Sequence, residues 1–340
     1  MTSRISPDRF YLALFLFSPF WLLFSVASGA EWISFSQCLE IITGSGNPDL
    51  ATDRLILFSI RAPRVALTVC VGAILAICGA ALQGLFRNPL ADPSLIGVTA
   101  GCSAGASIII VITKDLGSDN MQALPLIGLG SAFGGFTAVL LVYRLATKNG
   151  QTSVPTMLLA GIAVSAVAAA TNTLLSYFSN NDMLRRMSLW HMGSVEGANW
   201  SHVLIAILIS LFIPVLLRQG SALNALALGE SEARHLGIAV EKLKKKLIVI
   251  TAFGVGFAVA VTGVIAFVGL IVPHMVRLIL GPDHNHLLPA SALMGGILLS
   301  LADVFSRTLI APAELPIGVL TTLLGAPIFF YILTRNNSTF

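Results

Sequence analysis

Few residues in this sequence have the types and spacing that chemistry requires. His284 and His286 flank an asparagine in an HNH triplet that resembles a metal-ligand spacing. The triplet follows Gly281-Pro282-Asp283 without a cysteine or carboxylate cluster, so we expect a solvated turn and no metal site. The sequence contains no GxxxxGK[ST] phosphate loop and no evident pair of nucleophile and base. The residue types therefore predict neither a catalytic centre nor a nucleotide site.

Three carboxylates, Asp92, Asp303 and Glu314, lie closest to apolar segments of the chain. Ionisable residues within a membrane are functional candidates, for example as members of a proton relay. Each of the three stands alone and close to the end of a predicted helix, which disfavours a relay. They would become central only if the protein were a secondary transporter driven by an ion gradient.

The stretch Gln83–Gly97 reads QGLFRNPLADPSLIG and interrupts two long apolar runs. It places an arginine, an asparagine, an aspartate and two prolines between segments that are otherwise apolar. Polar backbone that breaks a helix is tolerated at membrane depth only where it is buried in protein or lines a wet cavity. This stretch is therefore where we expect a transport pathway.

The composition indicates that lipid surrounds most of these segments. The chain has 340 residues, of which 56% are hydrophobic and only 11% charged, and its mean hydropathy is +0.87. A net charge of +4 arises from basic residues at the ends of predicted helices, which gives no footprint for nucleic acid. The four cysteines show no CxxC spacing and are expected to be small buried apolar residues. The composition predicts a polytopic membrane protein.

The apolar runs predict an all-α protein with about ten transmembrane helices in one domain, residues 1–340. The first run is longer than the apolar part of a signal peptide and is expected to be a membrane span. An arrangement with both termini inside places 13 of the 20 basic residues on the inner side, as the positive-inside rule requires. The predicted spans are 10–29, 64–86, 94–113, 122–146, 154–177, 200–217, 244–266, 270–281, 287–306 and 316–334.

Two polar segments lie between these spans. Residues 30–60 form an outer loop that we expect to be structured only in part. Residues 218–246 form the longest inner segment, and within it 218–243 contains two short helical patterns separated by Gly229 and ended by Gly237. Such a pair of helices on the membrane surface requires a partner to cover its exposed side.

Glycines recur at a spacing that permits close helix packing in lipid, with Gly101 and Gly105 in one span and Gly130 and Gly134 in the next. A weak internal similarity also relates residues 79–90 to residues 269–280. Transporters often contain such repeats with the pathway between them.

Four motifs resemble the membrane permeases of type II ABC importers, the FecCD and vitamin B12 permease family, and among them most closely the haem permeases. In order along the chain they are RAPRVALTVCVGAILAICGAALQGLFRNPLADPSLIGV, GESEARHLGI, GVIAFVGLIVPHMVRLILGPDHNHLLP and LADVFSRTLIAPAELPIGVLTTLLGAPIFF. The similarity extends from Arg61 to Arg335 without large gaps.

The resemblance implies a permease with ten helices that forms a homodimer in the bacterial inner membrane, with both termini in the cytoplasm. Two ATP-binding subunits and a periplasmic substrate-binding protein would complete the importer. The permease itself would be no enzyme and hold no permanent cofactor or metal, since its partner subunit uses the ATP.

The resemblance also assigns roles to residues of this sequence. Residues 221–238 match the helices that dock on the ATPase, and the matching residues are Gly229, Glu230, Arg234 and Gly237. Arg61, Arg64 and Arg307 match arginines that receive acidic groups of the binding protein, although arginines reaching to the lipid interface would need no partner. Asn88 and Leu90 match an inner gate, and Thr152 and Ser153 are candidates for a second constriction. Pro273, His274 and Arg277 match a PHxxR signature in which the histidine would anchor packing and hydrogen bonds.

The substrate is expected to enter near residues 183–200. Arg185 and Arg186 could meet the propionates of haem, and His191 and Met192 could contact its iron transiently. This set favours haem, whereas a ferric siderophore and, less favoured, cobalamin remain alternatives. The same residues could also belong to a packed outer helix.

Overall fold

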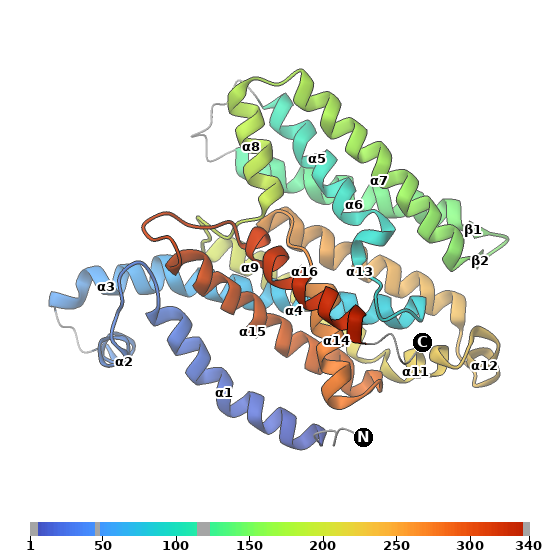
Figure 1. Ribbon diagram of the computed structural model, residues 1–340, viewed down its shortest axis with the longest axis horizontal. Helices are drawn as coiled ribbons and strands as arrows, with labels where there is room; N and C mark the ends of the chain where they lie inside the picture. The colour runs from blue at the N-terminus through green and yellow to red at the C-terminus, as the bar shows by residue number, and fades with distance from the viewer. Residues whose placement is uncertain (1–5, 45–47, 114–122, 336–340) are drawn as a thin grey trace.

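The computed structural model describes residues 6–44, 48–113 and 123–335, and it is almost entirely helical (Figure 1). Seven helical stretches within these ranges are long and apolar enough to cross a membrane, and three shorter apolar helices accompany them. The protein is therefore a multi-pass membrane protein. The long stretches are α1 (Pro7–Ala27), α4 (Ala62–Phe86), α6 (Ala123–Ala146), α7 (Val154–Tyr177), α9 with α10 (Trp200–Ser210, Ile213–Leu217), α13 (Val240–Thr262) and α15 (His284–Thr308). The shorter ones are α5 (Val98–Ile112), α14 (Val268–Leu280) and α16 (Ile317–Arg335).

Each of the ten predicted spans coincides with one of these apolar stretches, so the predicted helical architecture is confirmed. Arg4 and Lys114, which entered the count of basic residues, lie outside the described residues. The predicted span 270–281 corresponds to α14, which has only 13 residues.

Helix α4 is the centre of the bundle and packs against α13, α14 and α15 (Figure 1). Glycines allow the closest approaches: Gly72 lies against the backbone of Gly295 in α15, and Gly79 against that of Gly269 in α14. A β-carbon at either position would clash with backbone. The segments 79–90 and 269–280, related by weak similarity, therefore contact each other in the core.

Helices α5, α6 and α7 form a second group above the first in Figure 1, and α13 packs on both groups. Gly101 lies against Gly134 and Gly105 against Gly130, which brings α5 and α6 together as the glycine spacing predicted.

The described residues of the segment 30–60, which exclude 45–47, are largely helical, and this corrects the expectation of a loop. They contain α2 (Phe35–Thr43), a short 3₁₀ helix (Pro48–Leu50), α3 (Ala51–Leu55) and a π-helical turn (Ile56–Arg61) that runs straight into α4. Ser34 and Gln37 form a capping box that begins α2. Cys38 and Ile41 then pack with Leu57 in a small core of their own. Local capping and this satellite core outweigh the polar composition of the segment.

The two ends of the bundle differ. At one end lie α2, α3 and the α15–α16 connection, on the left of Figure 1, and we call it the arginine end because it contains Arg61, Arg64 and Arg307. At the other end lie α11 (Gly220–Ala227), α12 (Glu230–His235) and the hairpin of β1 (Thr147–Lys148) and β2 (Gln151–Thr152). We call this the hairpin end.

Candidate functional site

The predicted coupling segment forms two short helices joined by a sharp bend. Gly229, between α11 and α12, has φ +125° and ψ 155°, and Gly237 after α12 has φ +82°. Backbone with positive φ favours glycine, which explains why glycine occupies both bends of the segment. The helical pattern predicted for residues 218–243 is confirmed, whereas its docking on an ATPase stays a prediction.

Helix α11 is held to the start of α15 by a polar contact. Asn224 donates a hydrogen bond to Asp283 at 2.6 Å, and its carbonyl oxygen accepts one from the backbone N–H of His284 at 2.9 Å. Asp283 also caps α15 through the N–H of Asn285. The hydrogen bonds from Asn224 and Asn285 lower the pKa of the Asp283 carboxyl.

The HNH triplet is correspondingly part of α15, not a solvated turn, which corrects that expectation. His284 is 6% exposed and packs next to Gly84 of α4. No group of three or more metal-binding side chains occurs among the described residues. His274 of the PHxxR signature packs in α14, but neither ring nitrogen has a hydrogen-bond partner within the described part of the chain. The packing expected of His274 is therefore present, whereas its expected hydrogen bonds are not made within the described residues.

A cleft of about 500 Å³ at the hairpin end brings together residues from two of the predicted sets. Thr152 and Ser153 line it from the hairpin and the start of α7, and Glu230 and Arg234 line it from α12. Lys244 and Glu241 of α13 complete the wall between them. The candidate constriction and the candidate coupling helix therefore share one cavity.

The other candidate gate residues, Asn88 and Leu90, do not line this cleft, although their neighbour Arg87 does. Arg87 ends α4 with φ +51°, and the Asn88 side chain then accepts a hydrogen bond from the N–H of Leu90 at 2.9 Å. Asp92 starts the 3₁₀ helix η3 (Pro93–Ile96) by accepting from the N–H of Ser94. The break at Gln83–Gly97 thus contains a turn in which the Asn88 side chain accepts a backbone hydrogen bond, and Asp92 is a helix cap.

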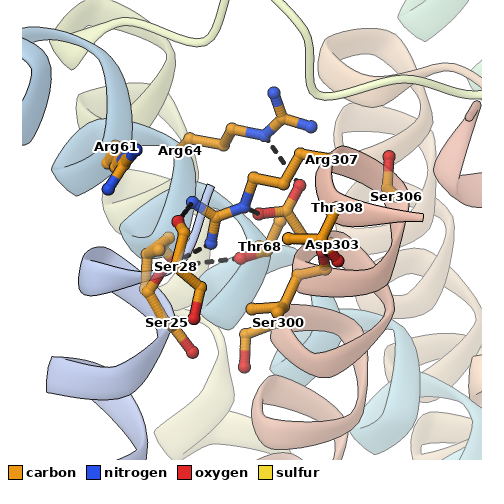
Figure 2. A network of polar contacts seen from close by, with 12 residues as sticks. Ser25, Ser28, Arg61, Arg64, Thr68, Ser300, Asp303, Ser306, Arg307 and Thr308 are labelled. Atoms are coloured by element: carbon orange, nitrogen blue, oxygen red, sulfur yellow. Dashed lines mark hydrogen bonds and ion pairs between the residues drawn. The ribbon is translucent and has the colours of Figure 1, made fainter. Parts of the chain in front are cut away.

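At the arginine end, Arg64, Asp303 and Arg307 form a buried ion cluster (Figure 2). Arg64 contacts Asp303 at 2.7 Å, and Arg307 contacts the other oxygen of the same carboxylate at 3.3 Å. Arg64 also makes two hydrogen bonds to Glu314, of 2.8 and 2.9 Å. Asp303 is fully buried, whereas the side chain of Glu314 is 32% exposed.

Backbone carbonyls accept further hydrogen bonds from the arginines of this region. Arg307 donates to the carbonyls of Ser25, in the last turn of α1, and of Ser28, which caps that helix. Arg61 donates to those of Val26, Ala27 and Glu31. Each of the three predicted docking arginines is only 5% exposed. They therefore do not reach to a lipid interface, and docking of a binding protein's carboxylates on them stays a prediction.

The cluster also corrects the expectation that Asp303 and Glu314 stand alone. Arg64 joins them, although the two carboxylates are eleven positions apart in the sequence. Sequence reasoning missed this pairing because Arg64 lies 239 positions from Asp303. A carboxylate paired with two arginines and buried in this way is suited to hold helices together, not to release a proton.

The four predicted substrate-path residues all lie on α8 (Asn181–Met192), near the arginine end (Figure 1). Arg185 and His191 are exposed, whereas Arg186 and Met192 are partly buried. His191 contacts the hydroxyl of Ser103 in α5 at 3.3 Å, and partial removal of its ring from water lowers the pKa of the imidazole. Met187 instead packs in a small core with Ile110 and Ile127. The structure therefore brings the four candidates onto one helix and its end, without showing a closed pocket around them.

Comparisons with known proteins agree with this geometry. The sequence model of the FecCD transport family matches residues 16–335. The hemin transport system permease protein HmuU of Yersinia pestis is 44% identical over 287 residues, which cover 82% of this chain and 83% of the relative. The vitamin B12 import system permease protein BtuC of Salmonella arizonae is 39% identical over 331 residues, covering 96% and 94%.

A solved structure extends the similarity to three dimensions. It is described as an inward-facing conformation of an ABC transporter of the metal-chelate type, and it superposes with a TM-score of 0.84 at 32% sequence identity. The match covers 97% of this chain and 99% of the other.

Proposed function

The chain belongs to the FecCD transport family of ABC importer permeases, and we propose that it moves haem across the bacterial inner membrane into the cytoplasm. The observation that supports haem as the substrate is the 44% identity to a hemin permease over most of both chains. The side chains of α8 support it, because Arg185 and Arg186 could pair with propionates and His191 could meet the iron.

In this proposal the permease acts as a homodimer, with a binding protein at the arginine end and two ATPase subunits at the hairpin end. The arginine end would face the periplasm, and both termini would lie in the cytoplasm. The α11–α12 pair would dock on the ATPase, as the residues Gly229, Glu230, Arg234 and Gly237 predict. ATP hydrolysis would take place on the separate subunit, and the permease would supply the path and its gates.

Cobalamin is the second candidate, because a vitamin B12 permease matches over 96% of this chain at 39% identity. Ferric siderophores are a third, since they are metal chelates of the type named for the similar structure. An ion-coupled transporter is a different class, and the pairing of Asp303 and Glu314 with arginines disfavours it.

Proteoliposomes that contain the permease, its ATPase and its binding protein provide the test. We expect ATP-dependent uptake of haemin in preference to cyanocobalamin and a ferric hydroxamate. Arg185→Ala combined with Arg186→Ala should slow haemin delivery without changing ATPase assembly, and Arg54→Ala, which removes an exposed arginine from α3, serves as the control. Preference for another cargo would overturn the assignment of haem as the substrate. Uptake that does not require ATP and stops when the proton gradient is removed would overturn the assignment as an ATP-driven importer.

A further inference from the structure

Lys244 is a buried cation in a run of otherwise exposed lysines. Its side chain is 2% exposed, whereas Lys242, Lys245 and Lys246 are exposed on the same first turns of α13. Removing an ammonium group from water costs several kcal/mol unless charged or polar partners surround it. The position therefore requires partners, and they come from three different elements.

The partners of Lys244 join α12 to the hairpin. Its ammonium group lies 2.7 Å from a carboxylate oxygen of Glu230, at the start of α12. It also donates a hydrogen bond of 2.8 Å to the backbone carbonyl of Thr152, at the end of β2. Within its own helix it contacts Glu241 at 3.2 Å.

Glu241 closes the connection from the other side. Its second carboxylate oxygen accepts a hydrogen bond of 2.9 Å from the backbone N–H of Thr152. The backbone N–H and C=O of Thr152 are therefore both held by the Lys244–Glu241 pair. Because Thr152 precedes Ser153, the cap of α7, the cluster holds the hairpin at the point where it enters that helix.

Packing alone gives α12 and the hairpin little other connection. α12 packs mainly on α11 and α13, and the hairpin packs mainly on α6 and α13. The cleft of about 500 Å³ lies between them, so one side of the hairpin adjoins open space. A displacement of α12 would therefore act on the hairpin through the ionic contacts of Lys244, since separating a buried ammonium from its carboxylate has a large free-energy cost.

From these contacts we infer that Lys244 is a positioning residue which transmits movements of α12 to the hairpin, and thereby to Thr152 and Ser153. The inference rests on the proposed function, because the ATPase would supply the movement of α12. Glu230 would transfer the movement of α12 to Lys244, and Lys244 would transfer it to the hairpin at Thr152. Arg234, 3.5 Å from Glu230 and 3.8 Å from Glu241, supplies a second cation that keeps both carboxylates paired as the cluster shifts.

A spin-label distance measurement tests the relay. Gln151→Cys, on the exposed hairpin, is labelled in a chain whose four native cysteines are replaced by alanine. The complex with the ATPase is measured without nucleotide and after trapping with ATP and vanadate, so that the distance between the two copies reports the hairpin. Lys244→Met, which keeps the side-chain length and removes the charge, is compared with Lys245→Met as the matched exposed control.

We expect trapping to shift the distance in the parent and in Lys245→Met, and Lys244→Met to lose the shift. ATP hydrolysis should continue in Lys244→Met while haemin uptake is lost, a separation that a merely structural lysine would not produce. A Lys244→Met complex with the parent's shift would overturn the relay.

Two further arms keep the outcomes distinct. If Lys244→Met does not assemble, Glu230→Gln weakens the same link from a partly exposed position and should reduce the shift, whereas a parent-like shift would overturn the relay. A parent that transports haemin without any hairpin shift would also overturn the relay and leave the proposed function standing. A parent that neither binds the ATPase nor transports would overturn the proposed function instead.

Discussion

Both ends of the bundle bury a cation between two carboxylates, yet the two clusters connect very different elements. At the arginine end, Arg64 joins Asp303 and Glu314, and it lies between α4 and α15, which pack closely along their lengths. At the hairpin end, Lys244 joins Glu230 and Glu241, and it links two small elements that have few other contacts with each other.

The difference in surroundings predicts a difference in function. An ion cluster between helices that already pack closely adds stability and fixes their register, and its loss is felt by the whole fold. An ion cluster between small elements beside a cleft of about 500 Å³ contributes less to the fold and more to how those elements move together. Arginine suits the first place because its planar group serves several acceptors at once, whereas lysine in the second presents a point charge on a flexible stem.

The largest effect is expected for Asp303→Ala at the arginine end. Asp303 is fully buried, and its removal leaves Arg64 and Arg307 without their shared carboxylate. Breaking a buried ion pair in this way typically costs about 3–5 kcal/mol. We expect a marked fall in the thermal midpoint of the purified permease, measured by fluorescence in detergent.

Two variants serve as controls, because each removes one charge from an ion cluster and leaves Asp303 in place. Glu314→Gln should lower the midpoint much less, because Glu314 is 32% exposed and Asp303 remains on Arg64. Lys244→Met should also be mild, since Glu230 and Glu241 are partly exposed and stay close to Arg234. If Lys244→Met lowered the midpoint as much as Asp303→Ala, the contrast between the two ends would be lost.

Gly229→Ala is expected to have the next largest effect, and at the hairpin end. Gly229 has φ +125° and ψ 155°, and apart from its two chain neighbours no atom lies within 4 Å of where a β-carbon would be, so only backbone strain opposes the substitution. Such backbone costs an L-residue about 1–3 kcal/mol, which would be relieved by a change in the angle between α11 and α12. We expect weaker ATPase binding, measured by copurification, with little change in the midpoint.

Gly44→Ala is the matched control, because Gly44 has φ +79° and open space at the exposed end of α2. It should strain the backbone without changing ATPase binding. Equal binding by Gly229→Ala and the parent would show that the bend between α11 and α12 does not set the docking geometry.

The sequence allowed the helical architecture to be predicted well because lipid imposes long apolar runs. The bend at Gly229 and the close glycine contacts could be predicted because glycine lacks a β-carbon, which permits both positive φ angles and close helix packing. The hairpin at residues 147–152 was not predicted, since two-residue strands carry no periodicity.

The ion clusters could not be predicted for a different reason. Lys244 looked like one member of a basic run, and only the folded chain shows that it alone is buried. Asp303 and Glu314 looked isolated because their partner, Arg64, lies in a distant helix. Which charges pair depends on which helices pack together. A single sequence shows the spacing of residues along one helix, but it does not show which distant helix contacts it.

The smallest effect is expected for the polar contact between Asn224 and Asp283, which anchors α11 to α15. Asp283 accepts hydrogen bonds from Asn224 and from Asn285, and these lower its pKa. A carboxyl whose pKa is lowered on folding stabilises the fold above its unfolded pKa of about 3.9, and this stabilisation is lost as the pH falls through the folded value. Asp283→Asn should therefore lower the midpoint slightly at neutral pH, because the amide oxygen can still cap the helix but lacks the charge that strengthens the hydrogen bonds from Asn224 and Asn285. The difference between the variant and the parent should begin to narrow as the pH falls below about 3.9, and it should close once the pH is below the lowered pKa of the folded state. A difference that persists in acid would assign the stabilisation to the shape of the side chain, and the anchor of α11 would then not depend on charge.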